Sequence, residues 1–330
     1  MAKLPEVLRD AGYKTFGAAA NFNIGEEMGF ARGFDRFKRI VERSAAVDAK
    51  SVTGEDDDDS AERIQEVIRG WKNEIEAADP FFLYLHFNDP HGPYRRHDRW
   101  YRDPAAENAP PVPKGGKAVL RYDSEIGYVD DVLAQIFEEF RLGENTIVII
   151  VSDHGFKPYS RLIRPNALLR QKGLGGEAYV IPEGGTAMVY STRQATKTRT
   201  LDQLRTIFQG LEGVDRILTP ADFASFGYPD PAKNPRMADL VLSAKDGYAF
   251  HGADDGDPVV SVPSGSTPGG HGYLSTDPDM LAVFVASGAG IRKGASPGEI
   301  SNLDVAPTIR SLLGLPQVET QGRVLSTILR

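Results

Sequence analysis

The stretch TIVIIVSDHGF, residues 146–156, joins a five-residue apolar run to an acid, an imidazole and a glycine. A continuous run of this length is typical of a strand that is buried on both faces of a parallel sheet. A second such run, FFLYLHF at residues 81–87, also leads into a polar loop. Ligands of open parallel sheets bind beyond the carboxyl ends of the strands, so we expect loops 88–99 and 152–158 to contribute to one site.

Strand-like and helix-like segments alternate along the chain, which predicts an α/β fold with a mixed, largely parallel sheet sandwiched by helices. We expect one domain over residues 1–330, with an inserted α+β subdomain at 159–270 where the pattern becomes less regular. Helices are predicted at 60–78, with Ser60 as N-cap, and at 118–143, 201–213 and 302–315. Further strands are predicted at 14–20, 186–191, 215–218, 239–243, 247–250 and 280–287.

The composition restricts the class of protein. With 41% hydrophobic and 25% charged residues, the chain can bury a sizeable core. A formal net charge of −8 argues against a general nucleic-acid-binding protein, and the absence of cysteine excludes disulfides and thiolate metal ligands within the chain. The first 15 residues lack the apolar core of a signal peptide, and no run of about 18 apolar residues predicts a membrane span. As given, the chain is expected in the cytoplasm.

Asp153 and His154 offer one carboxylate and one imidazole at a strand end. That mixed pair suits a divalent ion of the zinc or manganese type, whereas the carboxylate alone would suit calcium or magnesium. The alternative is that Asp153 caps the next turn and His154 is an ordinary loop histidine. His271, in the stretch GGHG, is a further candidate ligand because its flanking glycines allow close backbone approach. An exposed loop histidine remains the alternative there.

The loop after the strand at 81–87 carries Asn88, Asp89 and His91, and Pro90 and Pro93 stiffen it around His91. These side chains suit a metal or an anionic oxygen, although Asn and Asp more often make turn hydrogen bonds. We interpret Asn88 as a turn residue and His91 as functional. Lys157 follows the Asp153–His154 pair and suits a substrate oxyanion, with an exposed loop lysine as the alternative.

Taken in order, these segments resemble a known superfamily. FFLYLHFNDPHGPY, YDSEIGYVDDVLAQI and TIVIIVSDHGF resemble the sulfatase pattern within the alkaline phosphatase superfamily. From about residue 159 onward the chain is more similar to the type I phosphodiesterase/nucleotide pyrophosphatase branch. The segments that carry this second likeness are GTAMVY, MADLVLSAKDGYAF, GGHGYLSTDPDMLAVFVASGAGI and NLDVAPTIRSLLGLP.

The resemblance implies roles for particular residues. Asp153 and His154 match the C-terminal metal-ligand pair, and His271 matches the late histidine of the two-metal branches. His91 matches the sulfatase loop histidine that contacts the ester oxygens. Asp89 and Lys157 are substrate-binding candidates on their loop positions rather than on the resemblance. The two-metal branches also use a D-x-x-x-H loop motif, and the spacing of Asp89 and His91 departs from it.

The implied activity is sulfatase-like, metal-dependent hydrolysis of a small-molecule sulfate or phosphate ester, and a type I phosphodiesterase/nucleotide pyrophosphatase is the second alternative. The cofactor would be Ca²⁺ if the chain is sulfatase-like and Zn²⁺ if it is phosphodiesterase-like. Members of the superfamily carry a metal-binding Asp and a Ser, Thr or modified Cys nucleophile before the segment that matches residue 1 here. An N-terminal truncation is therefore expected, and a catalytically silent fragment or pseudoenzyme is the third alternative.

Overall fold

The computed structural model describes residues 3–41, 60–92, 94–106, 116–143, 145–193, 196–263 and 268–330. The chain forms two compact units. Unit 1 comprises Met1–Val148 and Ala286–Arg330, and unit 2 is the continuous segment Ile149–Val285. The predicted insertion at 159–270 falls within unit 2, and so do Asp153, His154 and His271.

The helices are α1 (Leu4–Asp10), α2 (Ser60–Gly70), α3 (Lys72–Glu76), α4 (Lys117–Glu139), α5 (Pro165–Gln171), α6 (Lys197–Gln209), α7 (Pro220–Phe223) and α8 (Val305–Leu312). The strands are β1 (Lys14–Ala19), β2 (Arg36–Arg39), β3 (Phe81–His86), β4 (Ile147–Val151), β5 (Lys157–Ile163), β6 (Ala178–Pro182), β7 (Thr186–Ser191), β8 (Val214–Leu218), β9 (Leu240–Ala244), β10 (Gly247–Phe250), β11 (Val259–Ser261), β12 (Gly269–Gly270) and β13 (Phe284–Gly288). None of these helices is long and apolar enough to cross a membrane.

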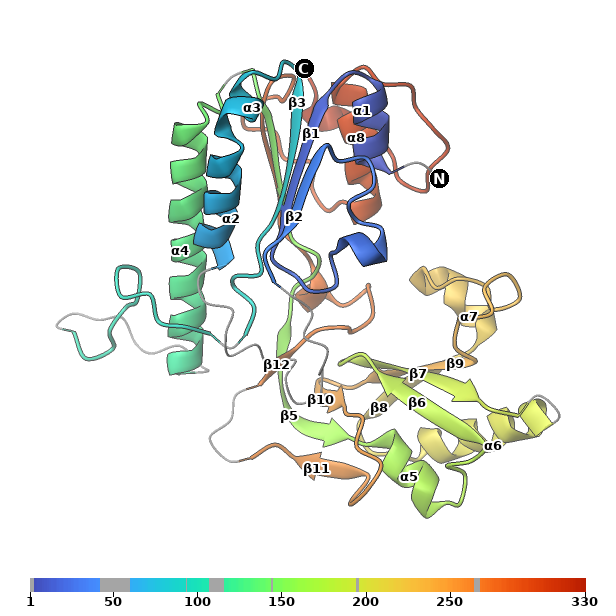
Figure 1. The fold of residues 1–330 in the computed structure, drawn as a ribbon. Coiled ribbons are helices and arrows are strands. Elements are labelled where there is room, and N and C mark those ends of the chain that lie inside the picture. Colours follow the sequence, from blue (N-terminus) through green and yellow to red (C-terminus); the bar gives the residue numbers. More distant parts are fainter. Residues whose placement is uncertain are drawn as a thin grey trace. The chain divides into compact units, whose positions relative to one another are not determined.

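Unit 1 contains a parallel sheet in the order β2-β1-β3. Helices α2 and α4 cover one face of this sheet, and α1 and α8 lie on the other side (Figure 1). Ile64 and Ile68, one turn apart on α2, are fully buried with Ile136 of α4 and Phe16 of β1. The apolar stripe on α2 therefore explains why this helix packs between α4 and the sheet.

The predicted helix over 60–78 is divided into α2 and α3. The division falls after Gly70, a residue that costs about 1 kcal/mol in a helix interior relative to alanine. The prediction of Ser60 as the N-cap was wrong. Ser60 lies in the first turn, and Asp89 from the loop after β3 accepts the Ala61 N–H at 3.0 Å and the Ser60 hydroxyl. Tertiary contact supplies the cap instead of the local sequence.

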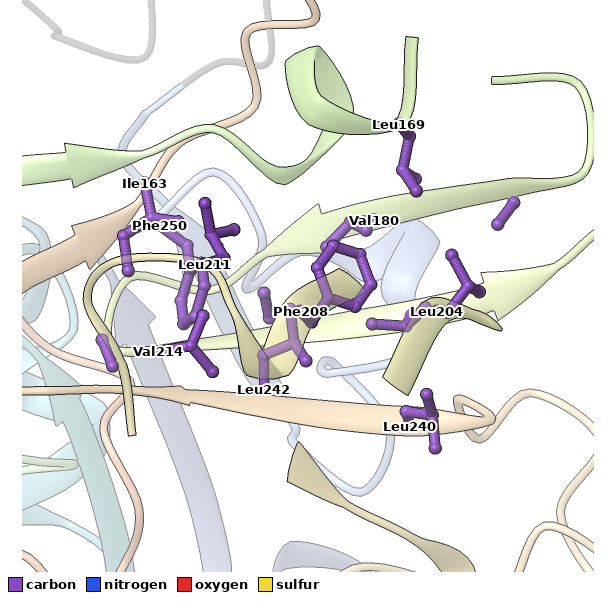
Figure 2. Close-up of a cluster of buried hydrophobic side chains, with 14 of the residues drawn as sticks. Ile163, Leu169, Val180, Leu204, Phe208, Leu211, Val214, Leu240, Leu242 and Phe250 are labelled. Atoms are coloured by element: carbon purple, nitrogen blue, oxygen red, sulfur yellow. The ribbon is translucent and has the colours of Figure 1, made fainter. Parts of the chain in front are cut away.

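Unit 2 contains an antiparallel sheet in the order β6-β7-β9-β8. Its core is formed where α6 packs on this sheet: Leu204 and Phe208 are fully buried near Val180 and Leu242 (Figure 2). Each such side chain contributes about 1.5–3 kcal/mol through burial. The core makes this sheet a firm support for the turns at its ends.

The strand β5 was not predicted, because its sequence KPYSRLI mixes apolar with polar residues. It forms because three other strands pair with it: β10 in parallel, and β11 and β12 antiparallel. The β5–β12 register places Gly270 opposite Lys157. Residues 269–271 are thereby brought back to the segment that follows β4. The mixed parallel and antiparallel α/β fold class is confirmed.

Candidate functional site

The turn Ser152–Gly155 follows β4 and is fastened by backbone contacts to residues 280–283. The Ser152 N–H donates to the Val283 carbonyl at 3.1 Å, and the Val283 N–H donates to Ser152 Oγ at 2.8 Å. The Gly155 N–H donates to the Met280 carbonyl at 3.2 Å. A Cβ at Gly155 would lie 2.2 Å from the Asp279 carbonyl oxygen, so only glycine fits here. The backbone on both sides of Asp153 and His154 is therefore fixed.

Asp153 and His154 turn their polar atoms toward each other. Asp153 Oδ2 lies 3.4 Å from His154 Nε2, and Asp153 Oδ1 accepts the His154 backbone N–H at 3.0 Å. His154 Nδ1 lies 2.9 Å from the Gly155 carbonyl oxygen, which can only accept, so Nδ1 carries the proton. In the neutral ring Nε2 then carries the lone pair, and this is the tautomer of a metal-ligating imidazole whose other nitrogen donates to a carbonyl.

His271 lies beside this pair, as the resemblance implied. Its ring centroid is 4.0 Å from that of His154, with 18° between the ring planes. Both rings are accessible to solvent: His271 is exposed, and the His154 side chain is 38% exposed. The structure thus brings together three residues that are up to 118 positions apart in the sequence (271 minus 153).

The donor set fits a divalent ion in part. Two ligand atoms bound about 2.0–2.2 Å from one tetrahedral ion are roughly 3.3–3.6 Å apart, and the 3.4 Å between Asp153 Oδ2 and His154 Nε2 matches. Within the described part of the chain, no three His, Asp or Glu side chains already converge as a complete metal site. The stacked orientation of His271 places its ring near the pair, and ligation by His271 would require that ring to rotate.

Lys157 is buried (7% exposed), in contrast to the exposed loop lysine that was the alternative. Its Nζ donates to Asp246 at 2.6 Å and to Asp277, and it lies 4.4 Å from the centre of the Tyr273 ring. Burial alone would lower the pKa of Lys157, but the hydrogen bonds to Asp246 and Asp277 outweigh it and raise that pKa.

Burial raises the pKa of the adjoining Tyr273 to about 12. Tyr273, Lys157 and Asp277 line a pocket of about 430 Å³. Contact between Lys157 and a substrate oxyanion stays a prediction. The geometry already assigns its ammonium group to two carboxylates.

Asp89 and His91 belong to unit 1, in the loop after β3. His91 is exposed, and its Nδ1 lies 2.7 Å from the Gly92 carbonyl oxygen, which leaves Nε2 available. Asp89 Oδ2 is engaged at the start of α2 through Ser60 and Ala61. The role of His91 toward an ester, and that of Asp89, stay predictions.

Sequence reasoning missed the residues that hold this loop in place. Glu125 of α4 is 2% exposed, and its Oε1 accepts the Arg95 N–H at 2.6 Å while Oε2 lies 3.6 Å from His97 Nε2. The His97 ring stacks on Tyr128 at 4.2 Å with 6° between planes. The pKa of Glu125 is raised, mainly by burial and also by the nearby Asp89 carboxylate. The hydrogen bond from the Arg95 N–H lowers this pKa, but by less. A glutamate on the buried side of an amphipathic helix was the available signal.

The sulfatase family profile matches residues 1–218 of the 330. The chain belongs to the sulfatase family. Within the alkaline phosphatase superfamily, this sulfatase-family chain is also similar to member 7 of the ectonucleotide pyrophosphatase/phosphodiesterase family. The Rattus norvegicus protein is 27% identical over 229 residues, which cover 64% of this chain and 45% of the relative. The Homo sapiens protein is 23% identical over 274 residues, 78% of this chain and 52% of the relative. The chain spans about half the length of these curated relatives.

Solved structures support the fold of this sulfatase-family chain. Murine and human ectonucleotide pyrophosphatase/phosphodiesterase 5 align over 99% of this chain and 75% of theirs, with a TM-score of 0.65 and identities of 15% and 18%. A phosphonoacetate hydrolase from Sinorhizobium meliloti aligns over 87% of this chain and 68% of its own, with a TM-score of 0.51 and 15% identity. At these identities the likeness concerns the fold alone.

Proposed function

We propose that this chain holds the metal-binding part of a phosphodiester hydrolase. The observation that carries the proposal is the cluster of Asp153, His154 and His271, in which two imidazoles lie 4.0 Å apart beside a carboxylate. Imidazole nitrogen suits Zn²⁺, whereas Ca²⁺ takes oxygen ligands almost throughout. The similarity to proteins named as pyrophosphatases/phosphodiesterases supports the same substrate class.

The residues of the chain would divide the work as follows. Asp153 Oδ2 and His154 Nε2 would hold one divalent ion, with His271 as the third ligand or as a partner of the ester oxygens. When bound, such an ion acts as a Lewis acid that stabilises the charge developing on the ester oxygens. His91 of unit 1 would contact the ester oxygens, as the resemblance implies; delivery of a proton through Nε2 would require the imidazolium, because Nδ1 holds the proton of the neutral ring. The attacking group is not assigned to any of these residues.

Sulfate ester hydrolysis is the second candidate. It is favoured by the match of residues 1–218 to the sulfatase family and by the histidine-bearing loop after β3. A single carboxylate-bound Ca²⁺ would then be expected at Asp153.

The test is the metal content and ester specificity of the purified 330-residue chain. We would measure bound metal by mass spectrometry beside the Asp153→Ala/His154→Ala double variant. The matched control is His251→Ala, because His251 is an exposed histidine of unit 2 outside the cluster. About one equivalent of zinc, lost in the double variant and kept in the control, with cleavage of bis(p-nitrophenyl) phosphate, would support the proposal.

Other outcomes separate the alternatives. Stoichiometric calcium with cleavage of p-nitrophenyl sulfate would replace the first candidate with the second. Bound zinc without turnover of either ester would refute hydrolysis by this chain alone and favour the catalytically silent alternative. No bound metal in the wild-type chain would refute the site itself.

A further inference from the structure

The hairpin turn between β6 and β7 contacts the backbone of His271 directly. The Gly185 N–H donates to the His271 carbonyl at 2.9 Å, and Thr186 Oγ1 donates to the Gly272 carbonyl at 2.8 Å. Two successive carbonyl groups at His271 are thus bound by two successive residues of the turn. Thr186 is 3% exposed, so water cannot readily replace its hydroxyl.

The fit between turn and loop is too close for any residue except glycine. Gly272 has φ +73°, and a Cβ there would lie 1.7 Å from the Glu183 carbonyl oxygen. Gly184 has φ +87°, and its Cβ would lie 2.2 Å from the His271 carbonyl oxygen. Both positions combine a left-handed backbone with a backbone neighbour that cannot rotate away. The two segments are therefore in backbone-to-backbone contact.

The turn is itself fastened to the core of unit 2. The Gly184 carbonyl accepts the Phe250 N–H at 2.7 Å, and the Gly185 carbonyl accepts the Ala244 N–H at 2.9 Å. Phe250 and Ala244 are 5% and 8% exposed. The core sheet therefore fixes the turn, and the turn fixes the backbone of His271.

On its other side His271 is preceded by β12, whose Gly270 pairs with Lys157 of β5. The backbone of His271 is thus held before and after, while its imidazole remains exposed beside that of His154. We propose that the 183–186 turn is a positioning element for His271, with Thr186 as its positioning residue. This inference rests on the proposed metal site, and it assigns the turn a task beyond closing a hairpin.

The test compares three single variants. Thr186→Val keeps the shape of the side chain and removes the hydroxyl, and Thr186→Ser keeps the hydroxyl. Thr206→Val is the matched control, because it removes an exposed hydrogen bond that the Thr206 hydroxyl donates to the Asp202 carbonyl, elsewhere in unit 2. Zn²⁺ affinity would be measured by competition with a chromophoric chelator. The imidazole signals of His154 and His271 would be recorded by NMR in the metal-free proteins.

Removal of a partner that orients a metal ligand typically weakens metal binding 10- to 100-fold. Because Thr186 acts through the backbone, we expect roughly tenfold weaker Zn²⁺ binding and shifted signals from both stacked rings in Thr186→Val. Thr186→Ser should recover most of both effects, and Thr206→Val should match the wild type. Thr186→Val with wild-type affinity and wild-type imidazole signals would overturn the inference.

Two further outcomes keep the inference separate from the proposed function. If the wild-type chain binds no zinc but Thr186→Val still shifts the imidazole signals, the positioning role stands and the metal proposal fails. If Thr186→Val does not fold, Thr186→Ala is the second variant, because it removes the hydroxyl without adding bulk, and Thr206→Ala is its control. Unchanged imidazole signals in Thr186→Ala would then overturn the inference.

Discussion

Replacing Lys157 with methionine separates a structural role from a substrate-binding role. Methionine keeps the unbranched apolar stem and removes only the ammonium group. In the wild type this group connects the start of β5 to Asp277 and to Asp246. Asp277 belongs to the segment whose carbonyl groups hold Gly155, next to the candidate site.

The expected loss of unfolding free energy in Lys157→Met follows from the exposure of each partner of Lys157. The Asp246 side chain is 94% exposed, so its ion pair contributes at most about 1 kcal/mol. The Asp277 side chain is 19% exposed, and breaking a fully buried pair costs about 3–5 kcal/mol. When Lys157 is lost, Asp277 is still partly solvated and still accepts the Asp279 N–H at 3.0 Å, so we take the cost of breaking the Lys157–Asp277 pair as about 2 kcal/mol. Loss of the contact with the Tyr273 ring adds about 0.5–1 kcal/mol, and the total is about 3 kcal/mol.

Urea unfolding provides the assay, because the two tryptophans, Trp71 and Trp100, both lie in unit 1. Far-UV circular dichroism reports both units, whereas tryptophan fluorescence reports unit 1. Lys157→Met should therefore lower the unfolding free energy seen by circular dichroism and change the fluorescence transition far less. Asp246→Asn is the control, with an expected change of about 0.5 kcal/mol.

The pH dependence has a definite sign. Because the pKa of Lys157 is raised in the folded state, its contribution is fully present below the unfolded pKa, about 10.4, and is lost as pH rises through the folded pKa. The effect of Lys157→Met should thus be constant between about pH 6 and 9. A loss below about 1 kcal/mol, together with a raised KM for a cleaved ester, would refute the structural assignment in favour of substrate contact.

Three further predictions concern unit 1 and use tryptophan fluorescence during urea unfolding. Asp89→Ala should lower the unfolding free energy by about 1–2 kcal/mol, because the Ala61 N–H loses its cap; an unchanged midpoint would contradict that role. The free energy of unfolding of Glu125→Gln should increase relative to that of the wild type as pH rises from about 4.5 to 8. The pKa of Glu125 is raised in the folded state, so the stability that this carboxyl group contributes is lost as pH rises through its folded pKa. A difference in unfolding free energy that does not change with pH would contradict this prediction. Asp35→Asn should cost about 1–2 kcal/mol at pH 7 and less at pH 3. Burial acts against the ionised Asp35 carboxylate, but hydrogen bonds from the Thr15 N–H and hydroxyl outweigh it and lower the pKa of Asp35. The stability that the carboxylate contributes is therefore present above its unfolded pKa and is lost as pH falls through its folded pKa.

Continuous apolar runs were the most informative part of the sequence for the fold. The strands β3 and β4 lie within the predicted runs 81–87 and 146–152, because apolar and β-branched residues favour strands. The expected burial on both faces was wrong: β3 is half-buried throughout, and Ile150 and Val151 of β4 are exposed. By contrast, β12 consists of Gly269 and Gly270, which have no side chains to favour a strand. It forms only because β5 offers a paired edge, and this tertiary pairing is not visible in a local window.

The candidate site was predictable to a similar degree. Asp153, His154 and His271 were selected on their loop context and on the resemblance, and the structure places them together. Glu125 and Thr186 were not selected, because each contacts a segment far away in the chain: Glu125 lies 30 residues from Arg95, and Thr186 lies 86 residues from Gly272. Residues that support a site through the backbone of another segment carry no local signature.

The glycines around the histidines have a different role from the one that their sequence context suggested. Flanking glycine was expected to let the backbone approach a ligand, yet at Gly155, Gly184 and Gly272 the space of a Cβ is taken by a carbonyl oxygen of another segment, at 2.2, 2.2 and 1.7 Å. Each contact fixes the backbone at or beside one of the two stacked histidines. Ligands held on a fixed backbone need little reordering when an ion binds, which favours affinity and a single geometry. A site built in this way tolerates change in its exposed side chains better than in its glycines, because a new Cβ at these three positions must displace backbone.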